Sequence, residues 1–345
     1  MDWGSDATRV TNRSAAVEQA LIAVEAAGVT RASLAAVGHR VVHGGSRFRA
    51  PVLLDEAVLA ELDGLAELAP LHNPIGVETA RAALAALPRV PHVAAFDTAF
   101  HAALPEAAYV YPLPWRWHAE WGIRRFGFHG LSVAWSVRRA GALLDRPVGE
   151  LSVVVAHLGS GCSVTAVEGG RSVWTSMGMT PLEGLMMGTR AGSVDPGVLL
   201  GVVRDGRLSV DELADVLEHQ SGLLGVSGVS GDVRAVSAAA AGGDARAGLA
   251  LEMFVRRAAE GVAAAAVALA RLDAIVFSGG IGEHDGPLRA RIVDRLGVLG
   301  AAPIGIAETG EDGLLSGPGA RPAVLRVAAR EDLVIAEAVA ALVGG

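Results

Sequence analysis

Arginine, histidine and carboxylate side chains stand inside or beside apolar runs, where strand ends could gather them into one site. Arg40 lies within the apolar run 34–42, and Asp97 directly follows the apolar residues 93–96. His129 and Arg190 lie in glycine-containing segments farther along the chain. A guanidinium can hold a carboxylate or phosphate through two hydrogen bonds, and a carboxylate suits magnesium. These residue types fit phosphoryl transfer, although each arginine taken singly is more typical of a structural ion pair.

The absence of lysine limits the reaction mechanisms that the chain can use. All 29 basic residues of the chain are arginines. A Walker-type phosphate loop, a Schiff-base enzyme and a protein kinase each depend on a lysine. Those three mechanisms are therefore excluded.

The composition predicts a globular protein that acts on small molecules. The chain has 345 residues, of which 51% are hydrophobic, and this length favours two domains. Its net charge of -8 offers no basic face for nucleic acid or for a membrane, so neither is expected as a partner. Cys162 is the only cysteine, which excludes a disulfide within the chain. Because the first residues also lack a signal-peptide pattern, we expect a cytoplasmic protein.

The first hundred residues alternate between helical and strand patterns. A helix is expected within the first thirty residues, and the run 34–42 reads as a buried strand that ends in a glycine turn. A second helix is expected over 55–68. Asn73 is predicted to cap a third helix, with Pro74 at its first position. Residues 93–96 form another strand, and the alternation predicts an α/β fold with its site at strand ends.

Two glycine segments follow buried strands in the second half of the chain. Residues 151–176 predict a three-stranded meander with a glycine loop at 159–161, and the strand 274–278 runs into a second loop at 279–283. Such loops can direct backbone N–H groups at phosphate. A long helix is expected over 247–272, a linker over 310–322 and a final helix over 330–343.

The order of these motifs identifies a family. Segments 38–45, 68–74, 96–101, 125–130 and 157–196 resemble, in this order, the acetate kinase family over almost the whole chain. The block 175–196, which contains Thr180-Pro181-Leu182-Glu183-Gly184, is the most specific of them. The resemblance implies reversible transfer of a phosphoryl group between ATP and acetate, giving ADP and acetyl phosphate, with Mg²⁺ (or Mn²⁺) as the metal. It also implies a homodimer.

The resemblance further implies the domain organisation. Family members have two actin-like ATPase (ribonuclease H-like) domains around a cleft, and their final helix returns to the first domain. For this chain we expect a first domain of residues 1–98 plus 330–345 and a second, nucleotide-binding domain of residues 99–329.

The resemblance assigns the reacting groups residue by residue. Arg40, Asp97, His129 and Arg190 match the family's catalytic positions. Around the substrate it places, besides Arg40, the apolar residues Val42, Leu71, Phe128 and Pro181, which without the family would read as ordinary core. The histidines His39, His43 and His101 are expected to be structural.

Nucleotide and metal positions follow in the same way. The residues that match the family's nucleotide site are His72, His157, Leu158, Gly159, Ser160, Gly161, Asp232, Val233, Arg234, Gly280, Ile281, Gly282, Glu283 and His284. Asp97 and Glu331 match the carboxylates that hold the metal. Glu331 has the acidic neighbour Asp332, and the alternative is that these acids simply favour a helix N-terminus.

The sequence also departs from the family pattern. Family members open with a strand and an Asn-x-Gly-Ser-Ser-Ser-x-Lys type phosphate loop, which does not occur before Arg40. Ser160, Cys162 and His284 replace usual family residues. From the printed sequence we expect a truncated first domain, with ATP binding retained and phosphoryl transfer weakened, because donors around the phosphoryl group would be lost.

Two further functions stay open on the sequence alone. A catalytically impaired homologue would only bind nucleotide or dimerise. A propionate or butyrate kinase would keep the chemistry and change the pocket, since one methylene alters discrimination by only about 1–3 kcal/mol.

Overall fold

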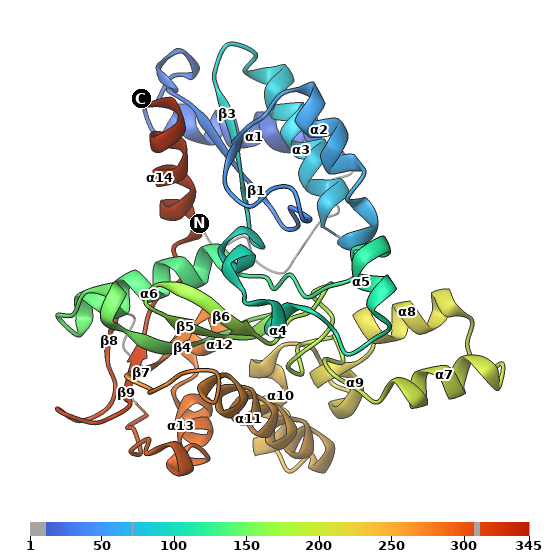
Figure 1. Ribbon diagram of the computed structural model, residues 1–345, viewed down its shortest axis with the longest axis vertical. Helices are drawn as coiled ribbons and strands as arrows, with labels where there is room; N and C mark the ends of the chain where they lie inside the picture. The colour runs from blue at the N-terminus through green and yellow to red at the C-terminus, as the bar shows by residue number, and fades with distance from the viewer. Residues whose placement is uncertain (1–11, 71, 307–310, 345) are drawn as a thin grey trace. The chain divides into compact units, whose positions relative to one another are not determined.

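The computed structural model describes residues 12–70, 72–306 and 311–344. The chain divides into two compact units, a first unit of Met1–Ala99 with Asp332–Gly345 and a second unit of Phe100–Glu331. Each unit has its own sheet and its own helices (Figure 1).

The first unit is built on a three-stranded sheet in the order β1-β3-β2. Strand β1 runs parallel to β3, with Val41 opposite Phe96, and β2 is antiparallel to β3. The strands are β1 (Val37–Val41), β2 (Val52–Leu53) and β3 (His92–Phe96), and the helices are α1 (Arg13–Ala26), α2 (Glu56–Asp63), α3 (Asn73–Ala86) and α14 (Glu331–Val343). Its core joins the sheet to α2 and α3 through buried side chains such as Leu59, Val77 and Phe96.

Two contacts hold α14 and α3 against strand β1 and the turn that follows it. Gly38 in β1 faces α14, and a Cβ there would collide with the side chain of Ile335, so the missing side chain lets the final helix pack on the strand. Asn73 does not cap α3 as predicted. It is the first residue of the helix, and its amide accepts a hydrogen bond from His43 N and donates one to His43 O, both at 3.0 Å. The correction reflects a tertiary partner thirty residues away that outcompetes the local cap.

The second unit is built on a six-stranded sheet in the order β6-β5-β4-β7-β9-β8. Strands β4, β7 and β9 are parallel, whereas β5 is antiparallel to β4, β6 is antiparallel to β5, and β8 is antiparallel to β9. The strands are β4 (Ser152–Leu158), β5 (Cys162–Glu168), β6 (Arg171–Thr175), β7 (Ala274–Ser278), β8 (Gly313–Leu314) and β9 (Ala323–Arg326). Strand β7 is buried along its whole length, as its continuous apolar sequence predicts for a strand covered on both faces.

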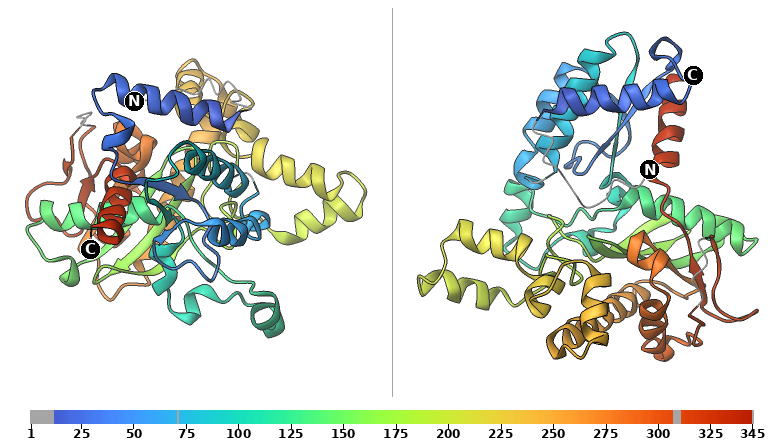
Figure 2. Two further views of the ribbon diagram at one scale, coloured as in Figure 1. Left: turned by 90° about the horizontal axis from the view of Figure 1, so that it is seen from above. Right: turned by 180° about the vertical axis from the view of Figure 1, so that it is seen from behind.

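Helices cover both faces of this sheet. Helix α6 packs on one face through Val133, Val137 and Ala140, and α11 lies on the other face (Figure 1). The helices of the unit are α4 (Glu106–Tyr109), α5 (Trp115–Trp121), α6 (Gly130–Leu143), α7 (Pro196–Arg204), α8 (Val210–His219), α9 (Gly222–Ser227), α10 (Val233–Ala241), α11 (Ala245–Ala266), α12 (Gly279–His284) and α13 (Gly286–Asp294). Helices α7 and α8 contain no buried residue and extend side by side from the rest of the unit (Figure 2). Within the described ranges, no helix combines the length and apolar character needed to cross a membrane.

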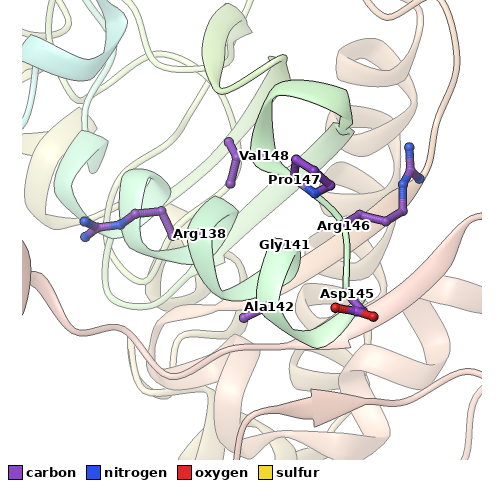
Figure 3. A pocket seen from close by; sticks show the side chains of 7 residues that line it. All are labelled: Arg138, Gly141, Ala142, Asp145, Arg146, Pro147 and Val148. Atoms are coloured by element: carbon purple, nitrogen blue, oxygen red, sulfur yellow. The ribbon is translucent and has the colours of Figure 1, made fainter.

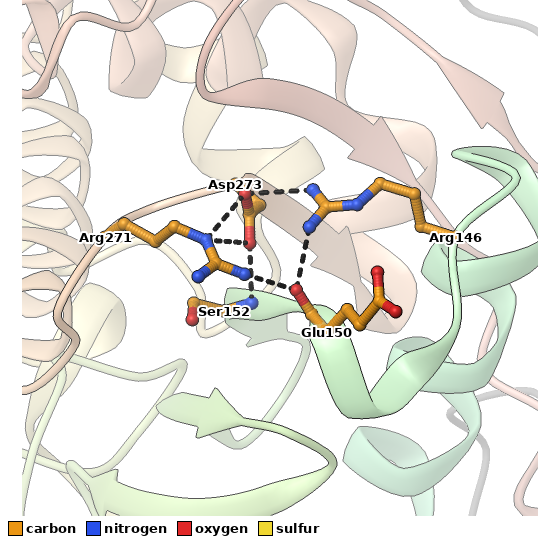
Figure 4. A network of polar contacts seen from close by, with 5 residues as sticks. All are labelled: Arg146, Glu150, Ser152, Arg271 and Asp273. Carbon is orange, nitrogen blue, oxygen red and sulfur yellow. Dashed lines mark hydrogen bonds and ion pairs between the residues drawn. The ribbon is translucent and has the colours of Figure 1, made fainter.

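A carboxylate network fixes the start of the central strands (Figure 4). Asp273, directly before β7, accepts hydrogen bonds from Ser152 N at 2.8 Å, from Arg146 at 2.9 Å and from Arg271 at 3.1 Å. Burial alone would raise the pKa of Asp273, but these donors together lower it. Because both arginines also donate to the Glu150 carbonyl, the turn before β4 is tied to the turn before β7.

Three predicted boundaries were wrong. The segment 310–322 is no linker, because Gly313–Leu314 forms β8 and Leu315 N donates to Val324 O at 2.7 Å, so its glycines and prolines serve a hairpin on β9. The helix predicted over 55–68 ends at Asp63 and is followed by a 3-10 turn over Ala66–Leu68. The glycines at 279–283 form the first turns of α12 rather than an open loop.

Candidate active site

Arg40 and Asp97 form the polar centre of the first unit. Because β1 and β3 are parallel neighbours, their carboxyl ends bring these two residues together. Arg40 Nε donates to Asp97 Oδ1 at 2.8 Å, and Nη2 donates to Oδ2 at 2.7 Å. The Asp97 side chain is 1% exposed, whereas the Arg40 side chain is 41% exposed. The carboxylate therefore anchors the base of a guanidinium that still reaches solvent.

The turn after β1 is held onto the start of α3. Val42, half-buried, directly follows β1, and His43 binds Asn73 through both of its backbone polar groups. Gly44 N donates to Thr98 Oγ1 at 3.1 Å, which ties the same turn to the residue after Asp97. His72 is the half-buried residue at the start of α3. Leu71, the remaining predicted pocket residue of this unit, lies outside the described residues.

Three histidines have internal partners of their own. His39 Nε2 lies 2.9 Å from His92 Nδ1, and burial followed by the neighbouring His92 lowers the pKa of His39 to about 4. His43 Nδ1 accepts from Gly45 N at 2.9 Å. His101 Nε2 donates to Phe128 O at 2.9 Å, and its Nδ1 lies 2.9 Å from Ser172 Oγ. These contacts give each ring a structural task.

Two stacked histidines form the centre of the second unit. The rings of His129 and His157 lie 4.2 Å apart between centroids, at 24° to one another. His129 Nδ1 lies 2.9 Å from Ser163 Oγ, and His157 Nδ1 lies 2.9 Å from Ser132 Oγ. His129 adopts a left-handed backbone conformation, with φ of 58°, at the position that precedes α6. A residue other than glycine in this uncommon backbone conformation suggests a functional constraint on the position of its side chain.

Glycine backbones lie against the Nε2 side of these rings. A Cβ on Gly161 would stand 3.2 Å from His129 Nε2 and 2.9 Å from Arg190 Nη2. A Cβ on Gly279 would stand 3.1 Å from His157 Nε2, and Gly279 has a φ of +77°. The turn after β4, the start of α12, both histidines and Arg190 thus converge at the carboxyl ends of β4 and β7.

Arg190 is held by a carbonyl rather than by a carboxylate. Its Nη1 donates to Pro181 O at 2.7 Å, and burial lowers its pKa. Among the residues that the structure describes, no carboxylate oxygen lies within 4.0 Å of its guanidinium nitrogens. Beside it, burial raises the pKa of the Cys162 thiol to about 12, so the thiol stays protonated and donates to Gly159 O. The site therefore keeps a half-buried positive charge beside a glycine turn, which suits an anionic ligand.

Apart from His72 in the first unit, the predicted nucleotide residues fall on three segments of the second unit. Asp232 caps α10 by accepting from Arg234 N at 2.9 Å, and its pKa is lowered mainly by the Arg234 side chain. Glu283 accepts from Ala329 N at 2.9 Å, and the neighbouring His284 side chain is 72% exposed. Leu158, Val233 and Gly282 are buried, Ile281 is half-buried, and Ser160 and Gly280 are exposed.

The predicted apolar residues of the second unit are buried. Phe128 is 1% exposed and its carbonyl accepts from His101, while Pro181 is buried and its carbonyl accepts from Arg190. Pro181 therefore adjoins Arg190 through its own backbone, and Phe128 directly precedes His129 in the chain.

The two predicted metal carboxylates differ in what holds them. Both oxygens of Asp97 accept from Arg40, yet each carboxylate oxygen has a second lone pair. Glu331 is the half-buried first residue of α14. Within residues 12–70, 72–306 and 311–344, no three His, Cys, Asp or Glu side chains form a metal-binding group. This donor set fits a magnesium ion that keeps its waters and binds substrate phosphates, not a caged ion.

Several residues of the site were missed by sequence reasoning. Ser132 and Ser163 orient the two histidines, and Asn73 holds the turn after β1. Tyr111 and Glu183 brace the segment that carries Pro181. Of these residues, only Glu183 carried a sequence signal of function, because it lies in the most specific motif. Ser132 and Ser163 stand in ordinary helix and strand sequences, and only the fold brings them next to the histidines.

Two cavities lie away from these residues. One of about 690 Å³ is lined mainly by apolar side chains of α14, such as Ile335 and Val339. Another of about 330 Å³ lies where α6 ends, beside Arg138, Gly141 and Arg146. Figure 3 shows the two arginine side chains of this second cavity pointing away from one another, so no charges converge in it. Neither cavity contains a predicted site residue.

Comparison with solved structures defines the class of protein. The crystal structure of a propionate kinase from Francisella tularensis aligns with a TM-score of 0.88 at 38% identity, covering 94% of this chain and 83% of that one. The Porphyromonas gingivalis acetate kinase aligns with a TM-score of 0.86 at 36% identity, covering 94% and 83%. The fold is therefore the predicted α/β fold of two actin-like ATPase domains, and the class is that of a phosphotransferase.

Sequence comparison narrows the class to a family. The acetate kinase of Deinococcus radiodurans is 48% identical over 335 residues, which cover 96% of this chain and 84% of that protein. The model of the acetokinase family matches residues 4–337. The chain belongs to the acetokinase family, and the family prediction is confirmed.

Proposed function

We propose that this chain catalyses reversible, direct in-line phosphoryl transfer between ATP and acetate, giving ADP and acetyl phosphate. The observation that carries the proposal is the convergence of Arg190, His129 and the Gly159–Gly161 turn at the carboxyl ends of β4 and β7. Such transfer needs little covalent chemistry from the protein, and catalysis comes from positioning and electrostatic stabilisation.

The second unit supplies the donors for the phosphoryl group. Arg190 presents a planar guanidinium to two phosphoryl oxygens, and His129 donates from Nε2 to a third. Because Ser163 adjoins Nδ1 of His129, the ring is held with its Nε2 toward the glycine turn. A preorganised donor of this kind is worth roughly 3–4 kcal/mol of transition-state stabilisation.

The nucleotide is bound by the same unit. The backbone N–H groups of Ser160 and Gly161 face ATP phosphates, supported by His157 and Leu158, while Gly159 N donates to Gly161 O at 3.1 Å and closes the turn. Gly280, Ile281, Gly282, Glu283 and His284 form the second glycine segment. Asp232 accepts from a ribose hydroxyl, with Val233 and Arg234 beside the nucleotide. His72, which belongs to the first unit, is the one further residue proposed for the phosphate site.

The first unit binds the acceptor. Arg40, oriented by its two hydrogen bonds to Asp97, pairs with the acetate carboxylate. The residues proposed to contact the methyl group are Val42 and Leu71 of this unit and Phe128 and Pro181 of the second unit. An apolar surround of this size discriminates between acyl chains only modestly, by about 1–3 kcal/mol per methylene.

Magnesium, or manganese in its place, is the proposed metal. When bound, the ion would neutralise the negative charge that develops on the phosphoryl oxygens. Asp97 would hold it through water, because Arg40 already donates to both carboxylate oxygens, and Glu331 is the second proposed carboxylate.

A coupled assay with purified protein tests the proposal. Hydroxamate formation from acetate, Mg²⁺ and ATP is measured beside propionate and butyrate, and ATP formation from acetyl phosphate tests the reverse direction. Acetate is expected to have the highest kcat/KM, as the 48% identity to an acetate kinase supports. ATP binding by calorimetry without transfer to any carboxylate would overturn the proposal in favour of an impaired homologue. Higher kcat/KM for propionate would change only the substrate.

The assembly and location remain part of the proposal. We infer a homodimer, testable by light scattering during size-exclusion chromatography, because the family resemblance implies one. A cytoplasmic location agrees with a single, buried cysteine and is tested by fractionating the source cells.

A further inference from the structure

A half-buried carboxylate bridge joins two segments of the second unit. Tyr111 Oη donates to Glu183 Oε2 at 2.5 Å, and Arg125 Nη2 donates to Glu183 Oε1 at 2.6 Å. The Arg125 side chain is 15% exposed and that of Glu183 is 35% exposed. Burial, and then the hydrogen bond to Glu183, raises the pKa of Tyr111, so its hydroxyl keeps the proton that it donates.

The same three side chains hold the backbone between β6 and Pro181. Arg125 Nη1 donates to Ser176 O and to Met177 O, each at 2.9 Å. Met179 N donates to Tyr111 Oη at 3.0 Å. The backbone adds to this, since Phe126 N and Gly127 N both donate to Gly178 O, at 3.0 and 3.2 Å. The segment from Ser176 to Met179 therefore has few polar groups that could move independently.

Gly178 shows how closely the bridge packs. A Cβ on Gly178 would collide with Glu183 Oε2 and with Tyr111 Oη. The carboxylate and the phenol therefore lie directly on the backbone of this segment. Any change of position of Glu183 must be accompanied by movement of the segment.

Both ends of the bridge lead to groups of the proposed active site. Pro181, two residues before Glu183, accepts from Arg190 Nη1 at 2.7 Å. Arg125 lies four residues before His129 and three before Phe128. The carboxylate thus connects the segment that positions Arg190 with the segment that carries His129.

We propose that Glu183, together with Tyr111 and Arg125, is a positioning residue that sets the distance between Arg190 and His129. This inference rests on the proposed function, because it concerns the geometry of the phosphoryl clamp. Misplacement of a reacting group by about 1 Å can cost on the order of a hundredfold in rate. An ordinary surface ion pair would contribute little to stability and nothing to that geometry.

The test compares Glu183→Gln, Tyr111→Phe and the double variant with Glu260→Gln, which removes a carboxylate from an exposed ion pair on α11. Three quantities are measured: kcat/KM for acetyl phosphate, Kd for Mg-ADP, and amide hydrogen exchange across residues 176–190. For Glu183→Gln we expect a loss of about 10- to 100-fold in kcat/KM, Kd within about twofold, and exchange about tenfold faster. The two single losses should be non-additive in the double variant, because both remove the same bridge.

The outcomes separate this inference from the proposed function. Normal kcat/KM and unchanged exchange in a folded Glu183→Gln protein would overturn it, and so would an equal loss of Mg-ADP affinity, which would indicate general disruption. If the unaltered protein transfers no phosphoryl group, the proposed function fails, whereas faster exchange at 176–190 still supports the bridge as the device that positions the Arg190 segment.

Discussion

Each unit has an arginine and a pair of histidines near the ends of parallel strands, but the two units use them differently. In the first unit Arg40 binds the carboxylate of Asp97, and His39 bonds to His92. In the second unit Arg190 donates to the Pro181 carbonyl, with no carboxylate partner among the described residues, and His129 and His157 stack while each faces a serine hydroxyl. The charge of Arg40 is compensated by a buried carboxylate, whereas Arg190 keeps a half-buried positive charge beside glycine backbone.

Under the proposed function, this difference assigns the two arginines different tasks. A guanidinium paired with a buried carboxylate is rigid and nearly neutral as a pair, which suits weak, reversible binding of acetate. A half-buried guanidinium without a carboxylate partner interacts more strongly with an anion than an exposed one does, because the protein around it screens the charge less than water does. Arg190 is therefore expected to matter for turnover, and Arg40 for both substrate binding and stability.

The largest expected effect is on turnover. Arg190→Ala should lower kcat at least about a hundredfold, because a preorganised charge at the phosphoryl group is lost. Its free energy of unfolding should change little, since no carboxylate of the described chain loses a partner. Steady-state kinetics and urea unfolding measure the two quantities, with the exposed Arg204→Ala as the control. Near-normal turnover in a folded Arg190→Ala protein would contradict the proposed role of Arg190 at the phosphoryl group.

The next effect is on stability and concerns the other arginine. Arg40→Ala leaves the buried Asp97 carboxylate without the donors seen in the structure, which should lower the free energy of unfolding by about 1–3 kcal/mol. Adding Asp97→Asn should restore part of this loss, because a neutral amide is less costly to bury. Urea unfolding of the two single variants and the double variant measures it. Equal stability of Arg40→Ala and the unaltered protein would contradict the anchoring role of this pair.

A pH effect distinguishes the histidine pairs. Since the pKa of His39 is about 4 in the folded protein and about 6.5 in an unfolded chain, only the unfolded chain gains the proton between these values. The contribution of His39 is therefore complete above about pH 6.5 and is lost as the pH falls towards 4. At pH 5 the loss should be about 1–2 kcal/mol relative to pH 7.

His39→Gln should flatten this dependence, whereas His284→Gln, at an exposed side chain, should leave it unchanged. Urea midpoints between pH 5 and pH 7 provide the measurement. Identical slopes in His39→Gln and the unaltered protein would show that another group causes the acid sensitivity.

The smallest effect concerns substrate size. Val42→Ala should raise the ratio of kcat/KM for propionate over acetate, by no more than the about 1–3 kcal/mol that a methylene allows. Val41→Ala is the matched control: Val41 is 1% exposed in the core of the first unit, so its truncation should cost about 1–2 kcal/mol of stability and leave the ratio unchanged. A constant ratio in a folded Val42→Ala protein would place Val42 in ordinary core.

Much of the scaffold was predictable because its signals are local. The apolar runs before Asp97 and Gly159 predicted strands that the structure contains as β3 and β4, and the order of the motifs predicted the family. The boundaries that failed, such as the supposed linker at 310–322, depended on glycine and proline residues whose local preference for turns fits a hairpin as well as a linker. The individual roles assigned to the site residues stay predictions.

By itself the sequence determined which residue types stand at strand ends and in glycine turns, because strand and turn preferences act over a few neighbouring residues. Only the tertiary structure decided the partners. Arg40 meets Asp97 across 57 residues of sequence, and Tyr111 meets Glu183 across 72. Such pairs depend on strand register and on how loops return to the sheet. No local pattern encodes them, since a hydrogen bond is selected by distances of about 3 Å in the folded chain.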